Sequence, residues 1–225
     1  MHKGKGMTTK AVAFDFDGVF VRDSDAVFKI EAWDIALAPW AGRYKPMLDE
    51  GRSIFGHGKK GGRLEILEYV FEKLGEPQEK IPALVAQAAK DFDEHVQNRI
   101  AEAGFVPGAL EMLQELSKLG IALYINSGTV TTALETSTKN LTIRSFFKGI
   151  LGSLKSKADN LRDITAREGI GSSAILVVGD GDSDYQAAQE AGCRFLGVAN
   201  KWNKWRSGEK NFPVVTDLRD VKDYI

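Results

Sequence analysis

The sequence has 225 residues and a formal net charge of -1 at pH 7, with 43% hydrophobic and 27% charged residues. These values are ordinary for a globular protein with a sizeable core, and they give no reason to expect nucleic acid or an anionic membrane surface as a partner. No apolar run approaches the roughly 20 residues that span a bilayer. Cys193 is the single cysteine, which excludes an intramolecular disulfide and predicts a reducing, cytoplasmic location.

Short apolar runs alternate with helical patterns along most of the chain. The runs are continuous, which is typical of parallel strands that are covered on both faces. Helical patterns with recognisable ends lie between them, as in the segment that begins at Pro107 and ends at Gly120. We expect strands at 11–14, 121–125, 149–152, 174–178 and 195–198. This order predicts an α/β core with a doubly wound, Rossmann-like parallel sheet.

The long segment between the first two strands interrupts this order, because it contains helical patterns and no convincing strand. Apolar residues in 64–74 and 81–100 recur at helical spacing, which predicts helices with a core of their own. The polar leader before Met7 is expected to lie outside the fold. We therefore expect an α/β core formed by 7–22 and 105–225, and an inserted helical domain at 23–104.

Small polar, acidic and lysine residues follow the strands of the core. In an open parallel sheet, ligands bind beyond the carboxyl ends of the strands, so these residues predict the site. In chain order they are Asp15 and Asp17, Ser127 and Gly128, Lys155 and Lys157, and Asp180, Asp182 and Asp184. Of these we interpret Asp182 as a solvated loop acid.

The residue types of this group predict phosphoryl transfer. Carboxylates that lie close together repel one another unless a cation lies among them, and oxygen ligands without histidine or thiolate favour Mg²⁺. Ser127 and the Gly128 amide would bind anionic oxygens, and a lysine would balance their charge. A carboxylate nucleophile, Mg²⁺ and positive groups together indicate an aspartyl-phosphate intermediate.

Four motifs occur in this order along the chain: "DFDGV", "NSGT", a lysine near 155–157, and "GDGDSD". Together they resemble the motifs of the haloacid dehalogenase superfamily, in the phosphoglycolate phosphatase-like branch with a helical cap after the first strand. The resemblance implies an Asp15 nucleophile, an Asp17 general acid/base, and catalytic roles for Ser127 and Lys157. It also implies that Asp15, Asp17, Asp180 and Asp184 hold Mg²⁺, and that Ser127, Gly128 and Lys157 bind the phosphoryl group of the substrate.

The second aspartate of the first motif favours phosphate chemistry, because dehalogenases of this superfamily lack it. Asp17 therefore predicts a phosphoric monoester hydrolase acting on a small phosphorylated metabolite. The alternative is a β-phosphoglucomutase-like sugar phosphomutase, which would need a cap residue that shuttles a proton; we find none that requires that role. We expect no nucleic-acid or membrane partner, and a monomer or small homo-oligomer.

Lys155 and Lys157 both lie where the third motif is expected. Ser156 has the position of a helix N-cap, which makes Lys157 the first helical residue. Side chains in the first turn tilt toward the helix N-terminus, and that end faces the carboxyl edge of the sheet. We therefore favour Lys157 over Lys155 as the phosphate-binding lysine.

Two further segments lie outside the motifs. We expect the helical domain to be a mobile cap, with Lys59, Lys60 and Arg63 of the "GHGKKGGR" loop facing the substrate. In "NKWNKW", Trp202 and Trp205 are interpreted as aromatic residues that anchor a loop just beyond the last strand.

Overall fold

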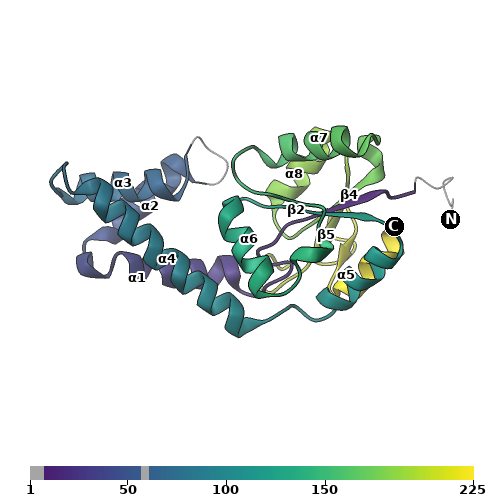
Figure 1. The fold of residues 1–225 in the computed structure, drawn as a ribbon, viewed down its shortest axis with the longest axis horizontal. Coiled ribbons are helices and arrows are strands. Elements are labelled where there is room, and N and C mark those ends of the chain that lie inside the picture. The colour runs from purple at the N-terminus through teal and green to yellow at the C-terminus, as the bar shows by residue number, and fades with distance from the viewer. Residues whose placement is uncertain (1–7, 57–60) are drawn as a thin grey trace. The chain divides into compact units, whose positions relative to one another are not determined.

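The computed structural model describes residues 8–56 and 61–225, which form two compact units. The boundaries between the units fall between Asp23 and Ser24 and between Glu102 and Ala103. The helical unit thus spans Ser24–Glu102, whereas the sequence predicted a helical domain at 23–104. One unit is a parallel sheet flanked by helices, and the other consists of helices (Figure 1). The predicted fold class, an α/β core with an inserted helical domain, is confirmed. The described residues include no helix with the length and apolar character of a membrane span.

The first unit is built on a six-stranded sheet, counted over the described residues, in which every neighbouring pair is parallel. Its strands are β1 (Ala11–Phe14), β2 (Ala122–Asn126), β3 (Gly149–Leu151), β4 (Ile175–Gly179), β5 (Arg194–Val198) and β6 (Val214–Val215). Their order is β3-β2-β1-β4-β5-β6, so the chain order reverses beside β1. In open parallel sheets, ligands bind beyond the carboxyl ends of the strands at such a reversal, which here lies between β1 and β4. The sequence did not predict β6, because a run of two valines is too short to mark a strand.

Helices cover both faces of this sheet. They are α5 (Ala109–Lys118), α6 (Thr131–Asn140), α7 (Lys157–Glu168) and α8 (Asp182–Ala191), with short helical turns η3 (Arg144–Phe146), η4 (Ser172–Ala174) and η5 (Leu218–Tyr224). Leu161 of α7 and Ala188 of α8 share a buried cluster with Ala11 and Ala13 of β1. Side chains alternate along a strand, so Val12 points to the opposite face, the side on which Figure 1 shows α5.

The second unit is a helical bundle with its own core. Its elements are η1 (Ser24–Phe28), α1 (Lys29–Ala36), η2 (Ala38–Trp40), α2 (Tyr44–Phe55), α3 (Arg63–Leu74) and α4 (Ile81–Ala103). Ring contacts join them: Trp33 of α1 lies 4.9 Å from Phe92 of α4, and Trp40 lies 4.9 Å from Phe71 of α3, measured between ring centroids. Most of the apolar positions that repeat in 64–74 and 81–100 lie in the interior of this unit, whereas Leu64 is 53% exposed.

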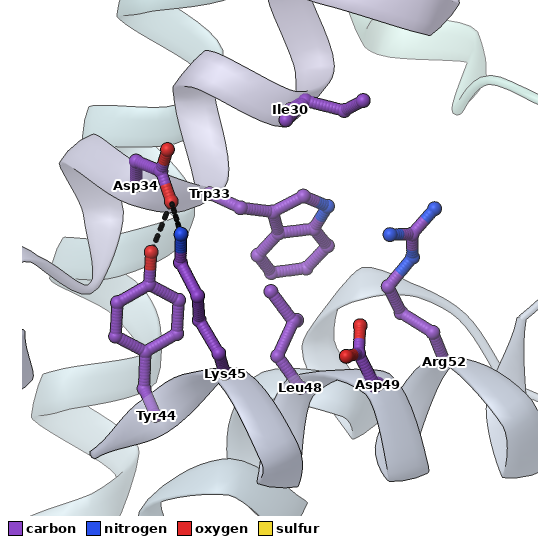
Figure 2. Close-up of a pocket in the computed structure, with 8 residues that line it drawn as sticks. All are labelled: Ile30, Trp33, Asp34, Tyr44, Lys45, Leu48, Asp49 and Arg52. Atoms are coloured by element: carbon purple, nitrogen blue, oxygen red, sulfur yellow. Dashed lines mark hydrogen bonds and ion pairs between the residues drawn. The ribbon is translucent and has the colours of Figure 1, made fainter. Parts of the chain in front are cut away.

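A small pocket of about 190 Å³ lies between α1 and α2 within the helical unit (Figure 2). It is lined by Ile30, Trp33, Asp34, Tyr44, Lys45, Leu48, Asp49 and Arg52. The Tyr44 hydroxyl donates to Asp34, and Lys45 Nζ lies 3.9 Å from the same carboxylate. Burial and the Asp34 carboxylate raise the pKa of Tyr44 to about 12. Its lining contains none of the site residues that the sequence predicted.

The predicted substrate-facing loop is described only in part. Lys59 and Lys60 lie outside the described residues. Arg63 begins α3, where its guanidinium lies 2.8 Å from the Asp93 carboxylate and 4.4 Å from the centroid of the Phe92 ring. Arg63 therefore joins α3 to α4 within the helical unit.

Candidate active site

Three buried or nearly buried carboxylates meet where β1 and β4 end. The Asp15 N–H donates to the carbonyl of Val178 at 2.9 Å, which holds Asp15 level with the end of β4. Asp180 follows β4 directly, and Asp184 lies in the first turn of α8. Asp15, Asp180 and Asp184 each offer a carboxylate oxygen, and these atoms lie within 4.8 Å of one another. The structure thus brings together acids that lie far apart in the sequence.

Lys157 lies against two of these acids. Its Nζ is 3.1 Å from Asp15 Oδ2 and 2.6 Å from Asp184 Oδ1, and its side chain is 16% exposed. Burial alone would lower the pKa of Lys157, but the adjacent Asp15 and Asp184 carboxylates outweigh burial and hold the pKa above its ordinary value.

The local structure around Lys157 agrees with the expected helix start. The Ser156 hydroxyl accepts a hydrogen bond from the Asp159 N–H at 3.1 Å, so Ser156 caps α7 and Lys157 is its first residue. Lys155 Nζ instead lies 2.6 Å from Asp163 Oδ2 in an exposed ion pair. The two candidate lysines are therefore separated, and Lys157 is the one that contacts the carboxylate cluster.

Two glycines make room for these acids. A Cβ at Gly179 would lie 2.5 Å from the Cβ of Asp184, and a Cβ at Gly18 would lie 2.2 Å from Asp180 Oδ2. Gly18 also has a φ of +76°, which disfavours other residues. Asp184 is held further by the Gly181 N–H, which donates to its Oδ2 at 3.1 Å. These contacts explain the glycines of "DFDGV" and "GDGDSD".

The cluster carries excess negative charge. Burial, with repulsion from Asp15 and Asp184, raises the pKa of Asp180 to about 7. Burial and repulsion from Asp15 also raise the pKa of Asp184 to about 6, although Lys157 opposes the shift. Among the described residues, Lys157 is the cation in contact with this cluster, and it contacts two of the three carboxylates, Asp15 and Asp184. Oxygen donors with uncompensated negative charge fit a divalent cation such as Mg²⁺.

Asp17 lies apart from the three-carboxylate cluster. Its side chain is buried, and the Thr129 hydroxyl donates to its Oδ2 at 2.7 Å. The group of potential carboxylate ligands comprises Asp15, Asp180 and Asp184, and the role of Asp17 as a further metal ligand stays a prediction. Sequence reasoning did not single out Thr129, although it completes the "NSGT" motif.

Ser127 and Gly128 lie in the loop that leaves β2. Phe14 of β1 is paired with Ile125 of β2, so this loop begins at the same edge of the sheet as Asp15. The Ser127 N–H donates to the Leu151 carbonyl at 3.0 Å, which ties the loop to β3. A Cβ at Gly128 would meet no atom within 4 Å, so there is space beside this backbone. The loop could thus accommodate an anionic group, as its predicted role requires.

Buried asparagines support the lysine, and the sequence analysis did not identify them. Asn126 Nδ2 donates to the Lys157 carbonyl at 3.0 Å. Asn160 Nδ2 donates to Asn126 Oδ1 at 3.0 Å and to the Gly152 carbonyl at 3.1 Å. These amides fasten the start of α7 to the end of β2. The sequence did contain a signal for Asn160, because it is a polar residue at a position of α7 that belongs to the buried, otherwise apolar face.

Known proteins match this chain over most of its length. A family model described as haloacid dehalogenase-like hydrolase matches residues 9–192. A phosphoglycolate phosphatase from Thiobacillus denitrificans is 27% identical over 203 residues, which cover 88% of this chain and 86% of that protein. A haloacid dehalogenase-like family protein from Streptococcus pneumoniae has a TM-score of 0.67 at 23% identity, covering 96% of this chain and 98% of that one. A β-phosphoglucomutase from Clostridium difficile has a TM-score of 0.69 at 17% identity, covering 96% and 95%.

The fold is a doubly wound parallel sheet, and a cluster of three carboxylates lies at its switch point. The chain belongs to the haloacid dehalogenase-like hydrolase family, as the sequence predicted. Its curated relatives place it among the phosphatases of that family. The solved structures share the fold, and their low identity shows no more than that.

Proposed function

We propose that this protein is a Mg²⁺-dependent phosphatase that hydrolyses a small phosphorylated metabolite, a phosphomonoester, through an aspartyl-phosphate on Asp15. The observation that carries the proposal is the contact of Lys157 with Asp15 and Asp184, beside Asp180, at the carboxyl edge of the sheet. A phosphatase needs a nucleophile, a positive group for the phosphoryl oxygens and ligands for a cation, and this cluster offers all three.

Asp15, Asp180 and Asp184 would hold the Mg²⁺ ion, with Asp17 as the further ligand that the motif implies. When bound, Mg²⁺ supplies positive charge that offsets both the carboxylates and the phosphoryl oxygens. Lys157, Ser127 and Gly128 would bind the phosphoryl group from their own strand ends. Because Lys157 is fixed by two carboxylates, its ammonium group is oriented before the substrate arrives.

The proposed reaction has two steps, formation of the aspartyl-phosphate and its hydrolysis. An Asp15 carboxylate oxygen attacks phosphorus, the bond from phosphorus to the ester oxygen breaks, and protonated Asp17 donates its proton to the leaving oxygen. Asp17, now ionised, removes a proton from water, and the hydroxide attacks phosphorus. The bond between phosphorus and Asp15 breaks, inorganic phosphate leaves, and both aspartates return to their starting states. Thr129, which donates to Asp17, holds that carboxyl group in one orientation.

The substrate class is proposed from the relatives. A phosphoglycolate phosphatase at 27% identity supports a small phosphomonoester such as 2-phosphoglycolate. The mutase alternative is supported by the fold of a β-phosphoglucomutase, so the assay should include a sugar 1-phosphate. Release of inorganic phosphate without isomerised sugar phosphate supports hydrolysis, whereas sugar 6-phosphate formed from the 1-phosphate supports the mutase.

Removing the metal is expected to stop phosphate release. Without a cation, the three carboxylates repel an incoming phosphate dianion. The measurement is release of inorganic phosphate from 2-phosphoglycolate and other small phosphomonoesters, with Mg²⁺, after excess EDTA, and after Mg²⁺ is restored. Full activity in excess EDTA would contradict the metal assignment.

Asp17→Asn is expected to lower kcat by about 10²–10⁴-fold, because the amide cannot donate the proton to the leaving group. Esters with a good leaving group, such as p-nitrophenyl phosphate, need less help from an acid. The rate at which the variant forms the aspartyl-phosphate from p-nitrophenyl phosphate should therefore fall much less. This rate is measured from the burst of p-nitrophenol. An equal loss for good and poor leaving groups would count against the acid role.

We also propose that the helical unit acts as a cap, because it is inserted directly after the first motif. The cytoplasmic location and the monomeric or small homo-oligomeric state stay predictions, as do the absences of nucleic-acid and membrane partners.

A further inference from the structure

We propose that Asn200 is a positioning residue for the metal site, which holds the Asp180 carboxylate in its ligating orientation. The inference rests on the proposed Mg²⁺ site and assigns a role to a loop outside the family motifs. Asn200 lies just after β5, and its Nδ2 donates to Asp180 Oδ2 at 2.6 Å. No sequence motif singled out this residue.

The orientation of the Asn200 amide is determined by its surroundings. Its Oδ1 accepts hydrogen bonds from the backbone N–H groups of Trp202 at 2.8 Å and Asn203 at 2.9 Å. Backbone N–H groups are donors only, so the oxygen of the amide must face them. The nitrogen must then face Asp180, where it can donate to a carboxylate oxygen.

The loop that carries Asn200 is braced against the sheet. Asn203 Nδ2 donates to the carbonyls of Asp180 and Val198, each at 2.9 Å, which joins the ends of β4 and β5. The Trp205 ring is buried against Gly197, where an added Cβ would approach the ring to 3.1 Å. The backbone N–H of Trp205 donates to Asn203 Oδ1 at 3.0 Å. Asn200 therefore projects from a braced segment, which allows it to set the position of another side chain.

The hydrogen bond from Asn200 is made to only one of the two carboxylate oxygens of Asp180. Asp180 Oδ2 accepts the hydrogen bond from the Asn200 amide and also lies close to Gly18. A Cβ added at Gly18 would lie only 2.2 Å from this oxygen. The hydrogen bond to Oδ2 restricts rotation of the carboxylate, and Oδ1 would be the oxygen available to a cation. Residues that orient a metal ligand in this way typically contribute 10–100-fold in metal affinity or activity.

The test measures Mg²⁺ affinity directly, by isothermal titration calorimetry on the full chain without substrate. Asn200→Ala removes the amide, and Asn200→Ser keeps a short acceptor for the loop N–H groups but cannot reach Asp180. The matched control is Trp202→Phe, which removes the hydrogen bond from the same loop to Asp23, 2.8 Å long, and leaves Asn200 in place. Thermal unfolding of each variant without Mg²⁺ reports damage to the loop itself.

We expect both Asn200 variants to raise the Kd for Mg²⁺ by about 10–100-fold, and Trp202→Phe to leave it within about twofold. The kcat of the Asn200 variants should return close to that of the parent at saturating Mg²⁺, which a purely structural defect would not allow. If the unsubstituted protein binds Mg²⁺ and the folded Asn200 variants bind it with the same Kd, the positioning role is wrong but the metal site stands. A parent that binds no Mg²⁺ would overturn the metal site and this role together.

Discussion

Replacing Asp15 with asparagine is expected to abolish turnover, with a loss of at least about 10⁴-fold in kcat, because a carboxamide is a poor nucleophile toward phosphorus. The protein should remain folded. Asp15 repels Asp180 and Asp184, so removing its charge relieves repulsion within the cluster while Lys157 keeps its contact with Asp184. The measurement is phosphate release at saturating Mg²⁺, together with the melting temperature in the absence of metal.

The matched control for this substitution is Asp182→Asn. Asp182 lies in the first turn of α8, close in sequence to two cluster acids, but its side chain is exposed and it is absent from the cluster. It should retain activity within about twofold, as surface substitutions usually do. Substantial turnover by Asp15→Asn, with a folded protein and bound Mg²⁺, would exclude Asp15 as the nucleophile.

Lys157→Ala is expected to lose about 10²–10³-fold in kcat, comparable with the removal of one donor that stabilises a transition-state oxyanion. Lys155→Ala should stay within about twofold. Lys155 forms an exposed ion pair with Asp163, and such pairs contribute little to stability or function. Phosphate release by the two variants at saturating Mg²⁺ and saturating substrate provides the comparison, and the reverse ranking would refute the assignment of Lys157.

Loss of folding has to be separated from loss of chemistry in the Lys157 variant. Removing this cation leaves buried carboxylates without their partner, which typically costs about 3–5 kcal/mol of stability. Mg²⁺ binds the same carboxylates, so it should restore much of the melting temperature of Lys157→Ala without restoring its activity. Lys157→Met, which fills the space without the charge, should show the same loss of kcat.

The sequence by itself determined the fold class and the residues that end up at one edge of the sheet. Five of the strands lie at the continuous apolar runs, because a strand covered on both faces needs apolar residues on both sides. Parallel strands place their carboxyl ends together, so the acids after β1 and β4 could be assigned to one site from their order in the chain. Ser156 marked the start of α7, and that local signal was sufficient to separate Lys157 from Lys155.

Tertiary structure alone decided which polar groups touch. Thr129 on Asp17, Asn160 on Asn126 and Asn200 on Asp180 join residues that lie 112, 34 and 20 positions apart. Such contacts depend on strand register and on how each loop packs over the sheet, and periodicity within one segment contains neither. For the same reason the sequence could not show that the Asp17 carboxylate accepts a hydrogen bond from Thr129, or that Lys157 contacts both Asp15 and Asp184.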